Sequence, residues 1–198
     1  RIPEGNSFKP LNLGQKRLVD ALLNPNISLV TCYGQAGTGK TLVSIAAGLH
    51  EVYGRHDNGL TTPPVPAGLR RKQSKKDGGA HSGSAAAKPY ESLLEQGVIE
   101  VEALCYIRGR SIPNRFFVLD EAQQLTPQEA RTVVTRMSRG SKLVMLGDPA
   151  QIDNPYVDSR SNGLVFTRNR LKGQPFVAHV SLSKEERSPL AEAGAQLM

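Results

Sequence analysis

Tryptophan is absent from this 198-residue chain, and only five Phe and five Tyr supply aromatic rings. Any core must therefore be mostly aliphatic, within a hydrophobic fraction of 38%. No apolar run approaches the roughly 20 residues of a membrane-spanning helix, so we expect no membrane span. The opening residues, RIPEGNSFKP, lack both the apolar stretch of a secretory signal and an initiator Met. We therefore expect a fragment or processed chain, with an upstream domain possible.

Cysteine and histidine are also scarce, with two and four residues. Cys32 and Cys105 lie in apolar segments and form no CxxC motif, which predicts buried free thiols and a reducing cytosol. The histidines lack metal-ligand spacing, so we predict no structural metal site. Positive charge is in excess, with a net charge of +7, and favours a polyanionic partner. Part of that excess is local, because five of the seven residues at 70–76 are basic.

The order of predicted elements indicates an α/β domain. Helical spacing of apolar residues predicts a helix over 13–23, ended by Asn24-Pro25-Asn26, and an apolar run predicts a buried strand over 27–33. The strand leads into GQAGTGKT and a helix over 42–53. Similar signals predict helices over 90–96, from Thr126-Pro127, over 162–171 and from Pro189, and strands over 98–102, 116–119, 142–146 and 176–182. This alternation predicts a mostly parallel sheet with helices on both faces.

Residues 55–88 interrupt this pattern. Gly, Pro, Ser, Lys and Ala dominate there, and GGAHSGSAAAK resembles a flexible linker. A structureless loop of this length is unusual inside a compact domain. We expect residues 1–198 to form a single domain that contains a disordered basic segment at 55–88.

Residues 34–41 match the phosphate-binding pattern GxxxxGK[ST] at every required position, between a predicted strand and a predicted helix. Glycines allow such a loop to wrap phosphates with backbone N–H groups at a helix N-terminus. We expect Lys40 to reach the β- and γ-phosphates of ATP and Thr41 to ligate Mg²⁺. The predicted nucleotide-binding residues are Gly34, Gln35, Ala36, Gly37, Thr38, Gly39, Lys40 and Thr41.

Two further strands end in polar motifs at the same predicted edge of the sheet. FFVL is followed by Asp120 and Glu121, an acidic pair that is common after strands but meaningful behind a P-loop. Asp120 is predicted to hold Mg²⁺, and Glu121 to polarise the attacking water as general base. KLVML is followed by GDPAQ, in which Gln151 is placed to sense the γ-phosphate or the water, unless the motif is only a turn.

Other polar residues allow a functional and a structural interpretation. Arg187 can stabilise charge on the transferred phosphoryl group, although an arginine near a helix start is more often a surface residue. Arg108 and Arg110 can grip a phosphate backbone or a neighbouring subunit's nucleotide, or be solvated charges. Gln15 can hydrogen-bond adenine, which is a weak inference by itself.

Several motifs together resemble the PhoH family of phosphate-starvation-inducible P-loop ATPases. They are GQAGTGKT, YIRGRSIP, LDEAQQLTP, GDPAQIDNPYVDSRSNG and ERSPLAE, and the resemblance covers roughly residues 10–53 and 90–198. It implies a RecA-like core related to superfamily-one helicases, a cytoplasmic location, and ATPase activity coupled to RNA in at least some members. It also implies a homo-oligomer, such as a ring in which a neighbour's arginine completes the site. Some members carry an upstream PIN ribonuclease domain, which nothing here resembles.

The resemblance also assigns residues. Gln15 matches the family's early glutamine, and Arg187 matches its late arginine. Lys40, Thr41, Asp120, Glu121 and Gln151 match the catalytic motifs. The chain departs from the family at 55–88, where Thr62 stands in place of the arginine of a TRP-like motif and the following segment is shortened. This departure puts strand engagement in doubt more than ATP binding.

Three functions compete. An ATPase coupled to RNA or single-stranded nucleic acid is favoured by the combined motifs. A regulatory module that holds and slowly turns over ATP without motor action is favoured by the altered Thr62 region. A nucleoside kinase of the thymidine kinase type is disfavoured, because such kinases carry a four-cysteine zinc site and this chain has two cysteines. One RecA-like domain also argues against unwinding by a monomer.

Overall fold

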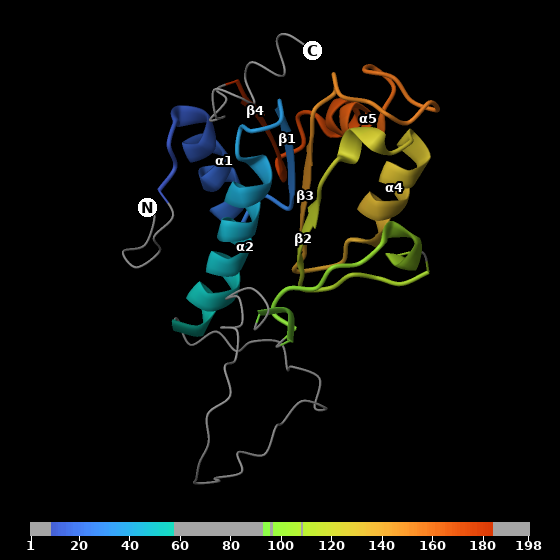
Figure 1. Cartoon of the computed structure of the whole chain (residues 1–198). Coiled ribbons are helices and arrows are strands. Elements are labelled where there is room, and N and C mark those ends of the chain that lie inside the picture. Colours follow the sequence, from blue (N-terminus) through green and yellow to red (C-terminus); the bar gives the residue numbers. More distant parts are fainter. Residues whose placement is uncertain (1–8, 58–92, 96, 108, 184–198) are drawn as a thin grey trace, which may run out of the picture.

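The structure is a computed structural model that describes residues 9–57, 93–95, 97–107 and 109–183. Its elements are α1 (Leu13–Leu23), β1 (Leu29–Gly34), α2 (Lys40–Asp57), η1 (Leu104–Ile107), β2 (Phe116–Leu119), η2 (Ala122–Gln124), α4 (Pro127–Arg136), β3 (Lys142–Gly147), α5 (Gly163–Leu171) and β4 (Val177–Leu182). Four parallel strands form one sheet, with α1 and α2 on one face and α4 and α5 on the other (Figure 1). The predicted α/β fold with helices on both faces is confirmed.

Local capping explains where three of the helices begin. Asn12 caps α1 by accepting a hydrogen bond from the Gln15 amide at 2.9 Å. Thr126 and Glu129 form the capping box predicted for α4, with Pro127 in the first turn. Asn162 caps α5 through the Val165 amide. Each cap satisfies a backbone donor that the helix itself leaves unpaired.

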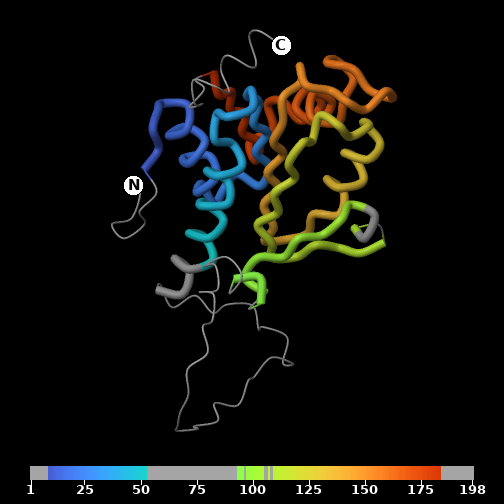
Figure 2. The backbone as a smooth tube through the Cα atoms, viewed as in Figure 1, coloured from blue at the N-terminus to red at the C-terminus, as the bar shows by residue number. Residues whose placement is uncertain are grey.

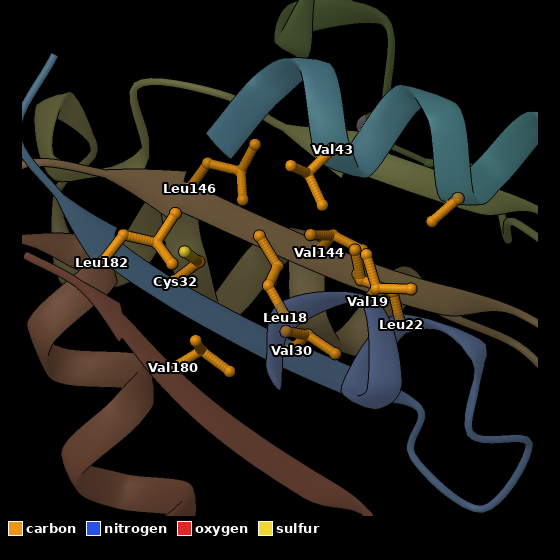
Figure 3. Close-up of a cluster of buried hydrophobic side chains, with 11 residues drawn as sticks. Leu18, Val19, Leu22, Val30, Cys32, Val43, Val144, Leu146, Val180 and Leu182 are labelled. Atoms are coloured by element: carbon orange, nitrogen blue, oxygen red, sulfur yellow. The ribbon is translucent and has the colours of Figure 1, made fainter. Parts of the chain in front are cut away.

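Alternate strand residues face two separate aliphatic cores. Val30 of β1 and Val144 of β3 face α1 and α2, where they join a cluster with Leu18, Leu22 and Val43 (Figure 3). Leu143 and Met145 face the opposite way, toward α4 and α5. Cys32 lies fully buried in the first core as a free thiol, as predicted, and burial raises its pKa to about 12. The side chain of Cys105 lies outside the described part.

In the strand order β2-β3-β1-β4, β3 lies between β1, which leads into the P-loop, and β2, which is followed by Asp120. This inserted strand is the arrangement of a RecA-like P-loop NTPase, which confirms the fold expected from the resemblance. Register pairs Tyr33 of β1 with Gly147 of β3, and Leu119 of β2 with Met145. Because the strands are parallel, the P-loop, the acidic pair and GDPAQ all follow strand ends at one edge of the sheet.

The strand predicted at 98–102 is wrong. Gly97 has a positive φ of 67°, and the Val98 and Ile99 amides both donate to the Leu93 carbonyl, at 2.9 and 3.2 Å, so the chain turns there. The residues that follow are irregular; Val101 is 86% exposed. Alternation in VIEVE suggested a strand, but within the described residues this segment has no ladder partner. Only 93–95 of the helix expected at 90–96 are described, and they are helical.

Several other predictions fall partly or wholly on residues that the structure does not describe. The second helix continues to Asp57, beyond the predicted end at residue 53. Figure 2 traces the backbone through the described elements in the same view as Figure 1. The remainder of the segment at 55–88, including Thr62, lies outside the described residues. So does the terminal helix expected from Pro189. Among the described helices, none is both long and apolar enough to cross a membrane.

Candidate nucleotide-binding site

The P-loop joins β1 to α2 and takes its shape from glycines. Gly37 and Gly39 have φ values of 83° and 84°, a region that side chains other than glycine rarely adopt. The Thr38 hydroxyl donates to the Gln35 carbonyl at 2.9 Å inside the loop. The loop therefore holds a tight turn at the start of a long helix, where backbone N–H groups favour a bound phosphate.

Lys40 folds back over this loop. Its Nζ donates to the Gly34 carbonyl at 2.6 Å and to the Gln35 carbonyl at 2.9 Å. The ammonium group is thus already at the mouth of the loop, where phosphate oxygens can replace the two carbonyls. This position fits the phosphate-binding role predicted for Lys40.

Gln15 braces the P-loop from α1. The side chain is 4% exposed, donates to the Thr38 carbonyl at 3.1 Å and accepts from the Leu11 amide at 2.8 Å. A Cβ at Gly39 would lie 2.9 Å from Nε2 of the Gln15 side chain, so this close approach of the side chain to the loop requires glycine at position 39. The structure therefore brings Gln15 to the loop. Its contact with adenine remains a prediction.

Thr41 and Asp120 meet across the gap between α2 and β2. The Thr41 hydroxyl donates to Asp120 Oδ2 at 2.6 Å, and both residues are exposed to solvent. A hydroxyl and a carboxylate side by side are the hard oxygen donors that Mg²⁺ prefers. In the described part of the chain no cluster of three or more His, Cys, Asp or Glu residues is suited to a metal. The pair therefore fits a Mg²⁺ ion whose remaining ligands are phosphate and water oxygens.

Glu121 follows in an uncommon backbone conformation, with φ 52° and ψ 36°. Its amide donates to Asp120 Oδ1 at 3.0 Å, which turns the chain sharply after the strand. Left-handed conformations are rare for residues other than glycine and often occur at functional sites. The turn leaves Glu121 exposed beside Asp120, where a carboxylate can accept a proton from water.

The GDPAQ loop follows β3. Asp148 is 8% exposed, and its carboxylate accepts from the Ala150 amide at 3.0 Å. The Gln151 amide donates to the Asp148 carbonyl at 3.0 Å, and Gln151 is exposed. The loop is a compact turn at the same edge as Thr41 and Glu121, consistent with the sensing role predicted for Gln151.

Two glutamines that sequence analysis did not single out connect these loops. Gln123 donates to Glu121 Oε2 at 2.6 Å and to the Gln151 carbonyl at 2.9 Å. Gln124 donates to the same carbonyl at 3.2 Å and accepts from the Asp153 and Asn154 amides, both at 3.0 Å. The signal in the sequence was their position just beyond the acidic pair and Ala122, in LDEAQQLTP.

Of the three predicted arginines, only Arg110 lies among the described residues. Arg110 precedes β2 in the chain, and its guanidinium pairs with Glu102 at 2.5 Å. Arg108 and Arg187 lie outside the described residues. The proposed contacts of Arg110 with nucleic acid therefore remain a prediction, and they require competition with Glu102.

A second polar group packs on the α5 side of the sheet, next to the P-loop strand. The Tyr33 and His179 rings lie 4.5 Å apart, and the Arg168 guanidinium lies 5.8 Å from the Tyr33 ring centroid. Burial raises the pKa of Tyr33, and the Arg168 charge partly opposes that shift. Burial and the Arg168 charge both lower the pKa of His179, against an opposing hydrogen bond to the Thr31 backbone. These shifts favour neutral side chains.

Comparison with known proteins places this site in a family context. A family model described as PhoH-like protein matches residues 82–197. Protein PhoH2 of Bacillus subtilis (strain 168) is 42% identical over 96% of this chain and 48% of its own length. Protein PhoH2 of Mycolicibacterium smegmatis is 34% identical, over 93% of this chain and 46% of its own length. A PhoH-like protein of Bacillus subtilis is 32% identical, over 94% and 62%.

The chain thus spans about half the length of these two PhoH2 proteins. Among solved structures, a Pif1 helicase from Candida albicans aligns with a TM-score of 0.40 and 17% identity, covering 90% of this chain and 41% of the other.

Proposed function

The chain belongs to the PhoH family, and on that premise we propose that this domain binds ATP with Mg²⁺ and hydrolyses the terminal phosphate. The observation that carries the proposal is the meeting of Thr41 with Asp120 at 2.6 Å beside the P-loop, with Glu121 next in the chain. Thr41 lies at the start of α2, after the loop that follows β1, whereas Asp120 and Glu121 follow β2, and β3 lies between these two strands. Their convergence combines phosphate binding, metal ligation and a general base at one edge.

Each residue has a distinct task in this proposal. The P-loop amides and Lys40 bind and orient the phosphates. Thr41 and Asp120 would hold Mg²⁺, which supplies charge neutralisation to the phosphate oxygens when bound. Glu121 takes a proton from water, the water oxygen forms a bond to the γ-phosphorus, and the bond between that phosphorus and the ADP oxygen breaks. Gln151 contacts the water or the γ-phosphate, and Arg187 stabilises the transferred group.

We further propose that single-stranded RNA or a similar nucleic acid stimulates this turnover, and that homo-oligomerisation places an arginine of one subunit at its neighbour's nucleotide. The net charge of +7 supports a polyanionic partner. The resemblance to RNA-coupled members supports the same partner class. The regulatory alternative holds ATP and turns it over slowly without motor action, so its turnover does not respond to nucleic acid.

Steady-state ATP hydrolysis with and without single-stranded RNA tests the proposal, with Lys40→Ala and Glu121→Gln as inactive controls. We expect RNA to raise the rate and both substitutions to abolish it. RNA binding should also weaken with salt, with a log–log slope of about −0.7 for each phosphate contacted. Turnover that is indifferent to RNA would support the regulatory module instead.

A further inference from the structure

Gln123 has no exposed surface, yet all of its polar side-chain atoms are used. Its side-chain nitrogen, Nε2, donates to Glu121 Oε2 at 2.6 Å and to the Gln151 carbonyl at 2.9 Å. The amide oxygen accepts from the Asp148 N–H at 3.3 Å. A single buried side chain therefore joins the acidic pair after β2 to the loop after β3.

The contact with Glu121 acts on a strained residue. Glu121 has a left-handed backbone, and its side chain is otherwise exposed to solvent. A carboxylate on such a turn has several rotamers, of which the hydrogen bond from Gln123 selects one. Hydrogen bonds to charged groups are stronger than neutral ones, and a buried donor loses little entropy when it forms one.

Gly147 is required for this arrangement. A Cβ at position 147 would lie 2.2 Å from Gln123 Oε1 and 2.8 Å from Leu164 Cδ2. The glycine at the end of β3 therefore makes the space in which the Gln123 amide lies. The close approach explains a glycine at a buried strand position where a larger residue would otherwise pack better.

Gln124 is a natural comparison, because it shares one contact with Gln123 and differs from it in the others. Both glutamines donate to the Gln151 carbonyl. Gln123 also reaches Glu121, whereas Gln124 reaches the Asp153 carboxylate at 3.2 Å. Loss of either amide leaves Gln151 held by the other, so the two substitutions separate the effect on Glu121 from the effect on the loop.

We propose that Gln123 is a positioning residue for hydrolysis. It holds the Glu121 carboxylate in a fixed position relative to Gln151, so that the general base Glu121 and the sensor Gln151 face the same water. This proposal rests on the proposed function of the site. Gln123 itself contacts neither nucleotide nor metal. Its effect is therefore on the rate of the chemical step and not on ATP binding.

Kinetics of Gln123→Met and Gln124→Met test the proposal. Outer partners that orient functional groups are typically worth about 10–100-fold in activity. We expect Gln123→Met to lower kcat by that factor with KM for ATP within about twofold, and Gln124→Met to lower kcat much less. Equal kcat in Gln123→Met and the unsubstituted protein, or equal losses in both variants, would overturn the proposal.

A double-substitution cycle distinguishes positioning from a structural role. If Gln123 acts through Glu121, adding Gln123→Met to Glu121→Ala causes no further loss in single-turnover rate. If the losses multiply, Gln123 acts independently of Glu121 and the proposal is wrong.

Hydrogen exchange gives a readout that does not depend on turnover. In Gln123→Met the amides of Glu121 and Asp148 should exchange faster, while in Gln124→Met the amides of Asp153 and Asn154 should do so. This readout separates the two claims, because a failure to hydrolyse ATP refutes the proposed function, whereas unchanged exchange at Glu121 and Asp148 refutes the positioning role.

Discussion

Lys40 is the residue at which we expect a single substitution to weaken ATP binding most directly. Its ammonium donates to the Gly34 and Gln35 carbonyls. In the proposed function, phosphate oxygens of ATP replace these two acceptors. A hydrogen bond to a charged group is worth about 1.5–3 kcal/mol, which is roughly a 10- to 150-fold change in affinity. Lys40→Ala should therefore weaken binding of a fluorescent ATP analogue by that factor.

The matched control is Lys172→Ala, which removes an exposed lysine that follows α5, away from the P-loop. We expect the affinity of this variant for the analogue to equal that of the unsubstituted protein. Equal affinity in Lys40→Ala would contradict the account of the P-loop.

The lowered pKa of His179 predicts that the protein becomes less stable as the pH falls. Burial and the Arg168 charge lower its pKa below the usual 6.5, so the unfolded chain takes up a proton before the folded chain does. The stabilising effect of neutral His179 is complete above pH 6.5 and is lost as the pH falls toward the lowered pKa. Thermal midpoints at pH 8 and pH 5.5 test this, since His179→Gln should reduce the loss between them. An identical loss in both proteins would refute it.

At the residue scale, sequence reasoning found the positions that act through contiguous motifs. Lys40 and Thr41 lie within eight consecutive residues whose pattern carries the function. Gln123 could not be assigned in this way, because its partners Asp148 and Gln151 are 25 and 28 residues away. They become neighbours only because β3 lies beside β2.

Among the elements, α4 sets the geometry just beyond the acidic pair. The Thr126 hydroxyl accepts from the Glu129 amide, and Glu129 in turn accepts from the Thr126 amide at 2.9 Å. Loss of such a cap typically costs about 0.5–2 kcal/mol. Thr126→Ala should lower the free energy of unfolding in urea by that amount.

Thr135→Ala is the control for this prediction, because Thr135 is exposed and its hydroxyl bonds only to the Thr132 carbonyl within the helix. Surface substitutions of this kind usually change stability by less than about 0.5 kcal/mol. A loss in Thr135→Ala as large as that in Thr126→Ala would show that the capping box does not stabilise α4.

Element boundaries were predictable where local chemistry decides them. Asn12, Thr126 and Asn162 are side chains that cap helices wherever the chain permits, and the helices start beside them. The prediction of a strand at 98–102 was wrong because a strand does not depend on local chemistry alone. A strand requires a partner, and alternation in the sequence does not say whether one is within reach.

At the scale of the whole molecule, strand order brings the site together. The sheet places three loops at one edge, and two cores on opposite faces hold the strands in register (Figure 1). This arrangement followed from alternating strands and helices, and from the family resemblance. The proposed oligomer and the proposed nucleic-acid partner do not follow from the strand order, and Arg187 lies outside the described residues, so both remain proposals.

The most direct test of the account is phosphate release from ATP and Mg²⁺ by the unsubstituted protein and by Glu121→Gln, with ATP affinity measured in parallel. Loss of a general base typically costs about 10²–10⁴-fold in rate. We predict that fall in kcat with affinity for ATP unchanged, because Glu121 acts on water while Lys40 and the P-loop bind the phosphates. Equal rates in the two proteins would contradict the account.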